Sequence, residues 1–195
     1  MLLVITALVL VASVPLAGGR LGALGEIRPR AVWSVLLAAA IQIAITQMAG
    51  GSHELHVVLH VLSYALDAYF LFANRRLVGV PLLAVGAALN VLAIVTNGGV
   101  MPANAAALRI SGIASRPGFD NSAVLAHPHL AFLGDVIPVP GPWPIGNVLS
   151  VGDLIIFIGA LIVLHVACGS RISRLRPGRR SARISRDARG STAGI

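Results

Sequence analysis

Five hydrophobic runs, each close to the length of a membrane-spanning helix, dominate the sequence. They cover residues 1–17, 31–49, 55–73, 78–96 and 151–168. A transmembrane helix needs roughly 20 mostly apolar residues to cross a bilayer. Because backbone polar groups find no water in lipid, such runs must form helices. We therefore predict an all-α, polytopic membrane protein with five transmembrane helices and a long apolar, proline-rich outer loop, residues 97–150, between helices 4 and 5.

The composition agrees with this architecture. The chain has 195 residues, of which 56% are hydrophobic and 11% are charged. A soluble domain of this size does not need so much apolar surface. We predict one transmembrane domain, residues 1–168, followed by a disordered, arginine-rich tail, residues 169–195. This division excludes a separate soluble catalytic domain.

The arginines predict the orientation of the helices. They gather at residues 20–30, at residues 75–76 and in the tail, which carries eight arginines against one aspartate. Positive residues mark cytoplasmic loops. We expect a multi-pass protein of the bacterial cytoplasmic membrane, with the N-terminus outside and the C-terminus cytoplasmic. The first run has positive residues after its apolar core rather than before it, so we favour a retained helix over a signal peptide.

The tail predicts contact with the membrane surface. Arginines beside a bilayer attract anionic lipid headgroups by roughly 1 kcal/mol per residue. Nucleic-acid contact is the less favoured interpretation of this tail. The lipid bilayer is the first expected partner, and a membrane-protein partner remains open.

Polar side chains recur along one face of the third run. They are His53, His56, His60, Tyr64 and Asp67, spaced three or four residues apart. This spacing keeps them on one face of a helix, and the opposite face is almost wholly apolar. We call these five residues the polar stripe. Because polar groups are costly in lipid, we expect the polar stripe to face the bundle interior.

Three interpretations of the polar stripe stay open. The first is structural: the stripe hydrogen-bonds polar side chains of the second or fourth run, with Asn90 the expected partner of Asp67. The second is a path for protons or a small solute, because Asp67 lies at membrane depth. The third is a zinc or copper site near the outer face. Its ligands would be His56, His60, His127 and His129.

Several familiar chemistries are absent from the sequence. The segment from His53 to Val57 resembles a zincin helix but lacks the second histidine of its motif. A bis-histidine haem is disfavoured because His165 would lie ~13 Å deeper than His60, at 1.5 Å rise per residue. There is also no phosphate-binding loop, no G-x-S-x-G and no C-x-x-C. No catalytic residue can be assigned.

The outer segment carries an isolated acid and a helix start. Asp135 lies in apolar surroundings, where an ionised carboxylate must be paired or hydrogen-bonded. We expect it to accept bonds from loop amides or from His127, His129, His56 or His60. Residues 150–153 begin with serine and end with aspartate, which predicts a capping box at the last helix. Residues 97–99, Asn-Gly-Gly, predict the end of the fourth helix, and Pro102 is expected to open a short helix.

Three motifs resemble a family of small bacterial membrane proteins known as domain of unknown function 5317. They are Asn97-Gly98-Gly99-Val100-Met101-Pro102, Phe132-Leu133-Gly134-Asp135 and Ser150-Val151-Gly152-Asp153. The resemblance covers roughly residues 1–168 and places a histidine where His127 or His129 stands. It implies that the outer segment is the special region, and it implies no activity.

The sequence favours a non-enzymatic membrane module that binds a partner or small ligand at its outer face. The candidate binding residues are Asn97, Asp135, Asp67 and Tyr64. The alternative is a metal-binding membrane protein or metal-dependent membrane enzyme that uses the outer-face histidines and Asp135.

Overall fold

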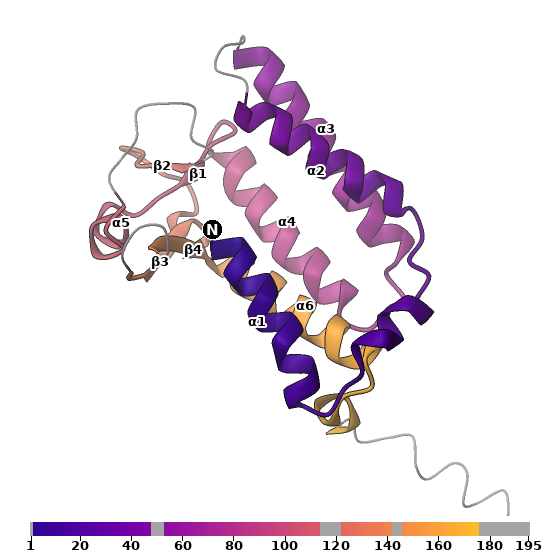
Figure 1. The fold of residues 1–195 in the computed structure, drawn as a ribbon. Coiled ribbons are helices and arrows are strands. Elements are labelled where there is room, and N and C mark those ends of the chain that lie inside the picture. Colours follow the sequence, from indigo (N-terminus) through magenta and orange to yellow (C-terminus); the bar gives the residue numbers. More distant parts are fainter. Residues whose placement is uncertain (1, 48–52, 114–121, 142–145, 176–195) are drawn as a thin grey trace, which may run out of the picture.

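The computed structural model describes residues 2–47, 53–113, 122–141 and 146–175. Each of the five hydrophobic runs forms a long helix in it. These helices are α1 (Leu2–Leu16), α2 (Val32–Gln47), α3 (His53–Ala73), α4 (Val80–Thr96) and α6 (Val151–Ala167). Helix α2 packs mainly on α3, and α4 mainly on α6, while α1 lies against α6 (Figure 1). The bundle is therefore built from two helix pairs and one additional helix.

Glycines bring the backbones of α4 and α6 together. A Cβ atom at Gly86 would lie 2.6 Å from the carbonyl oxygen of Gly152, and one at Gly79 would lie 2.7 Å from that of Gly159. Within each chain segment the two glycines are seven residues apart, which is about two helical turns. The same contacts therefore repeat along the pair, and no side chain larger than hydrogen fits at them. Pro81 stands in the first turn of α4, where a proline costs a helix little.

Polar side chains join α2 to α3 instead. The amide of Gln42 donates to Ser63 Oγ over 2.7 Å and lies 3.4 Å from His60 Nδ1. At the other end of the pair, the side chain of Asn74 accepts a bond from the backbone N–H of Arg30 and donates to its carbonyl oxygen. This pair is held by specific hydrogen bonds rather than by close backbone contact.

The described parts of residues 97–150, which we call the outer lobe, lie at one end of the bundle (Figure 1). Strands β1 (Met101–Pro102) and β2 (Ser122–Ala123) pair in parallel. Strands β3 (Asp135–Val139) and β4 (Asn147–Ser150) pair antiparallel. The short helices are α5 (Ala105–Ile110) and the 3-10 helix η2 (Ala131–Leu133).

The outer lobe adds short strands that the all-α prediction does not include. They are two to five residues long, and two of them contain a proline, Pro102 in β1 and Pro138 in β3, so the sequence shows no alternating apolar pattern to reveal them. Pro102 lies in β1 and does not open a helix. Helix α5 begins after Asn104, whose side chain accepts bonds from the backbone N–H groups of Ala106 and Ala107.

A small apolar cluster joins the outer lobe to the bundle. Ala93 and Ile94 of α4 are buried with Met101 and Leu133 of the lobe. Tyr64 of α3 packs against this cluster. The lobe therefore shares a hydrophobic core with α3 and α4.

The first residues of the predicted tail pack against the bundle. Residues 171–175 form the 3-10 helix η3 (Arg171–Leu175), within the segment for which the sequence predicts disorder from residue 169. Ser170 is buried against His165, and the backbone N–H of Arg171 donates to the carbonyl of Ala17. These contacts tie the segment to the ends of α6 and α1. The remainder of the predicted disordered tail lies outside the described residues, as do Pro142, Trp143 and Pro144 of the predicted outer loop.

Candidate functional site

A hydrogen-bonded network occupies the outer end of the α4–α6 pair. Asn90 of α4 donates to Asp153 Oδ1 over 2.8 Å and accepts from Ser150 Oγ over 2.9 Å. Ser150 and Asp153 also exchange both bonds of a capping box, which confirms the predicted start of the last helix. The network thus gives hydrogen-bond partners to groups in the first turn of α6 and fixes the position of this helix relative to α4.

Asp135 lies beside this network, in the outer lobe. It opposes Ser150 in the register of β3 and β4, and Ser122 Oγ donates to its carboxylate over 2.5 Å. Its backbone carbonyl accepts from the N–H of Asn104. Burial raises the pKa of Asp135 to about 6, the Ser122 bond opposes this rise, and the nearby Asp153 carboxylate adds to it. The donor to the carboxylate is therefore a serine hydroxyl, rather than one of the amides or histidines that the sequence suggested.

Asn97 holds the lobe to the end of α4. Its side-chain amide donates to the carbonyl of His129 and accepts from the backbone N–H of the same residue, each over 2.8 Å. It also donates to the carbonyl of Ala93, one turn back. Helix α4 ends at Thr96, and the two glycines after Asn97 have positive φ, as the predicted helix stop requires. Asn97 is therefore a structural clamp whose functional groups are used within the fold.

Residues of the polar stripe on α3 contact different parts of the molecule. His60 lies near Gln42 of α2, as the structural interpretation expects. The rings of His60 and Tyr64 have centroids 5.9 Å apart, and Tyr64 reaches the cluster under the outer lobe. His56 is buried. The side chain of His53 lies outside the description.

The predicted partnership between Asp67 and Asn90 is wrong. Asn90 uses its amide on Asp153 and Ser150, because these groups at the start of α6 lie directly against α4. Within residues 53–113 and the other described ranges, no hydrogen bond is found for the half-buried Asp67 carboxylate. Asp67 therefore lies outside the network that the structure does assemble.

The geometry gives the predicted zinc or copper site no support. Among the residues that the structure describes, no three His, Cys, Asp or Glu side chains are grouped so as to hold a metal ion. His127 and His129 are both exposed on the outer lobe. His56 and His60 stay on α3, and the structure does not gather the four histidines.

A buried histidine site that the sequence did not reveal lies at the opposite end of the bundle. His165 is 1% exposed, with Nε2 lying 3.0 Å from Ser13 Oγ and Nδ1 lying 2.8 Å from Ser170 Oγ. It joins α1, α6 and the segment that follows α6. Ser13 is 152 residues away in sequence, and only the apolar context of His165 could have signalled that it needs partners.

The fold and the site define a small helical protein in which a lobe containing short strands covers one end of the α4–α6 pair and contacts α3. The chain belongs to the family of unknown function DUF5317, whose sequences it matches over residues 26–165. Helix α1 therefore lies outside the matched range, whereas the three motifs lie within it.

An uncharacterised protein of Thermotoga maritima is 35% identical over 105 residues. The match covers 54% of this chain and 61% of the relative's length. No solved structure matches the chain.

Proposed function

We propose that this chain is an integral protein of the bacterial cytoplasmic membrane, crossing it five times. The observation that supports this proposal is the apolar surface of the long helices. Leu8, Leu36, Val61 and Val95, on four different helices, are each more than 60% exposed. Exposed apolar residues on every side of a bundle are expected for a lipid-facing surface, and a soluble monomer rarely carries so many.

Helix lengths give narrower support. One helix in the described ranges, at Glu54–Ala73, is long and apolar enough to cross a membrane, and only 17% of its apolar window is buried. The core helix of a soluble protein would be mostly buried. Helices α4 and α6 have 17 residues each, which lies at the lower end of the roughly 17–25 residues that span a bilayer. Helices α1 and α2 are one or two residues shorter.

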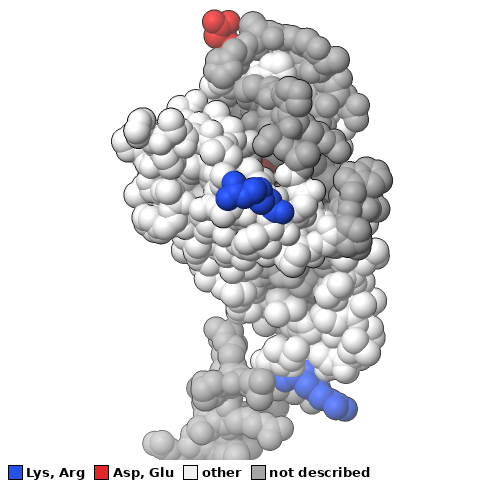
Figure 2. Space-filling view, turned by 90° about the vertical axis from the view of Figure 1, so that its left-hand side faces the viewer, with Lys and Arg blue, Asp and Glu red and all other residues white. Residues whose placement is uncertain are grey.

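Charge supports the orientation with a cytoplasmic C-terminus. Arg20, Arg30, Arg75 and Arg171 lie at the end of the bundle away from the outer lobe, where hydrogen bonds tie their segments together. The face in Figure 2 carries few charged side chains between wide uncharged areas. Basic residues at one end and uncharged sides agree with the positive-inside rule.

Two measurements test this topology. The protein should stay in the membrane fraction after alkaline carbonate extraction. A reporter fused after Ile195 should be active only in the cytoplasm, and one inserted near Ser115 only outside. Release by carbonate, or an external C-terminus, would contradict the five-span proposal.

Within this membrane protein, the outer lobe is proposed to be a non-enzymatic binding module for a partner or small ligand. The supporting observation is the placement of Asp135. It combines a raised pKa of about 6 with a position in a lobe that Asn97 and a shared apolar core fix to the bundle. Perturbed carboxylates in fixed surroundings are candidates for binding sites.

Photocrosslinking from the lobe in living cells tests the binding proposal. Phe132 is 66% exposed on the lobe, and Leu36 is 64% exposed on α2, so they form a matched pair of probe positions. A photoreactive residue at position 132 should give a discrete protein or small-molecule adduct that position 36 does not. The adduct should weaken in an Asp135→Asn background. Equal labelling at both positions would remove the case for a lobe-specific partner.

A further inference from the structure

A pocket at the arginine-rich end of the bundle has a well-fixed frame. Its volume is about 440 Å³, and it is lined by Gly18, Arg20, Ala23, Glu26, Ala167, Cys168 and Gly169. The 3-10 helix η1 (Leu21–Glu26) forms one side, and the ends of α1 and α6 form the others. The backbone N–H of Arg20 donates to the carbonyl of Cys168 over 3.0 Å. The segments around the pocket are therefore held by backbone contacts, and the volume is within the range of small-ligand sites.

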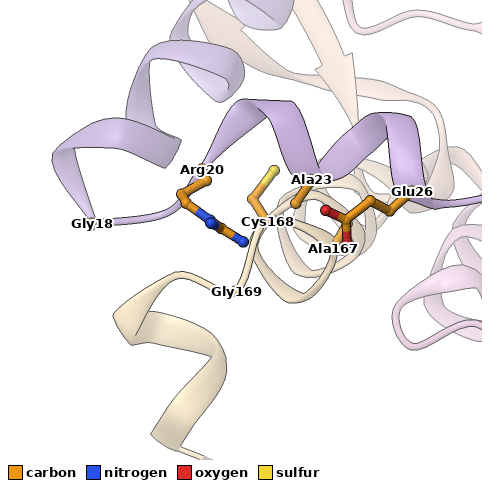
Figure 3. Close-up of a pocket in the computed structure, with 7 residues that line it drawn as sticks. All are labelled: Gly18, Arg20, Ala23, Glu26, Ala167, Cys168 and Gly169. Carbon is orange, nitrogen blue, oxygen red and sulfur yellow. The ribbon is translucent and has the colours of Figure 1, made fainter.

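Two opposite charges face each other across this pocket. Figure 3 shows the Arg20 guanidinium and the Glu26 carboxylate directed toward the same space from two sides. No ion pair joins them in the described part of the chain. The rest of the lining is small, with Ala23, Ala167 and the glycines. The pocket thus offers one positive and one negative group, separated by a space that neither side chain fills.

We propose that this pocket binds the zwitterionic headgroup of a phospholipid, with its phosphate at Arg20 and its primary ammonium at Glu26. Guanidinium groups bind phosphate through paired, charge-assisted hydrogen bonds. A carboxylate accepts from an ammonium group in the same way. A headgroup that lacks an ammonium group, such as that of phosphatidylglycerol, fits less well, because it offers Glu26 no cation to pair with.

The surroundings of the pocket suit a lipid rather than a soluble ligand. Leu16 is 87% exposed just before it, and Leu21 and Leu24 of η1 are 39% and 38% exposed. These side chains would contact acyl chains next to a bound headgroup. The inference rests on the proposed membrane location, because only there does a lipid reach this end of the bundle.

Native mass spectrometry of the full-length protein in detergent tests the inference. The probe is an equimolar mixture of phosphatidylethanolamine and phosphatidylglycerol with identical acyl chains. The wild type should retain phosphatidylethanolamine in about two- to fivefold excess, the range expected for one exposed ion pair. Glu26→Gln should equalise the two lipids, and Arg20→Gln should lower the retention of both. Arg20→Lys should restore most of that retention.

Arg28→Gln is the matched control, because Arg28 is exposed at the same end and does not line the pocket. It should behave as the wild type. Equal retention of both lipids by the wild type, or an equal loss in Arg28→Gln and Arg20→Gln, would overturn the inference. Tighter retention of glycerophosphoethanolamine than of phosphatidylethanolamine would assign the pocket to a free headgroup instead of a lipid. A protein that resists carbonate extraction yet shows no lipid preference loses only this inference, and the membrane proposal stands.

Discussion

The two helix pairs are held together by different means. In the α4–α6 pair, glycines seven residues apart place one backbone against the other, and Asn90 completes the contact at the outer end. In the α2–α3 pair, Gln42 and Asn74 join the helices through side-chain hydrogen bonds. Shape determines the first contact, and hydrogen-bonding chemistry determines the second.

This difference indicates which pair tolerates change. Where two helix backbones touch, no space is left for an added atom, so a larger side chain forces the helices apart. In the proposed membrane location, polar contacts between helices contribute little individually, because alternative partners are available when the helices separate. We therefore expect the α4–α6 pair, from whose ends the outer lobe extends, to be the less tolerant one.

The largest effect is expected from Gly86→Ala. The new Cβ would lie 2.6 Å from the Gly152 carbonyl oxygen and 2.8 Å from the backbone nitrogen of Ile156. Neither backbone atom can rotate away, so we expect a loss of roughly 3 kcal/mol, the upper part of the range for overpacking. Unfolding by titration with a denaturing detergent measures it. Gly22→Ala, with nothing within 4 Å of its added Cβ, is the control and should change stability little.

A smaller loss is expected from Asn90→Leu, which tests whether the polar end of the α4–α6 pair matters beside its glycines. The substitution leaves Ser150 Oγ and Asp153 Oδ1 without the partner that joins them to α4. Stranding buried polar partners costs roughly 1–3 kcal/mol. Val85→Leu, at a 51% exposed position of the same helix, is the comparison. Similar melting of both variants would mean that the glycines alone hold the pair.

Asp135, in the outer lobe, should make the free energy of unfolding depend on pH. Its pKa in the fold is raised to about 6 from 3.8. The stabilisation of the fold by protonated Asp135 is complete below pH 3.8 and is lost as the pH rises through about 6. Relative to the wild type, Asp135→Asn should therefore gain about 2–3 kcal/mol between pH 4 and pH 7. Melting curves at both pH values measure this gain, and a difference that is constant with pH would contradict the assigned burial.

The smallest expected effect lies in the α2–α3 pair. Gln42→Ala and Ser63→Ala each remove one end of a 2.7 Å hydrogen bond. A double-mutant cycle should give a coupling energy of about 0.6 kcal/mol, the average for such bonds between membrane helices. A coupling energy above about 2 kcal/mol would contradict the expectation that the α2–α3 pair is the more tolerant of the two.

Local signals in the sequence predicted the local features of the structure. The capping box of Ser150 and Asp153 and the helix stop after Asn97 each depend on residues within a few positions of one another. The partners of Asn90 and His165 could not be found in this way. Ser150 is 60 residues from Asn90, and Ser13 is 152 residues from His165, so only the packing of distant helices brings them together.

The outer lobe was the least predictable region for a related reason. Its strands are too short to show a period, and Asp135 meets Ser122 only because both lie in strands of the lobe. The choice of donor for a buried carboxylate depends on such pairings. The sequence showed that Asp135 needed a donor, and tertiary structure selected the serine.

The contacts of His165 also determine where its hydrogen atoms lie. The hydroxyl of Ser13 donates to the carbonyl of Leu10 over 2.6 Å, so its only proton is used. Toward a neutral imidazole, Ser13 can then only accept, which places the ring proton on Nε2. Nδ1 must accept in turn, and Ser170 donates to it. The three hydrogen bonds therefore run in one direction, from the Ser170 hydroxyl through the imidazole ring to the Leu10 carbonyl. A single tautomer of His165 holds the end of α6.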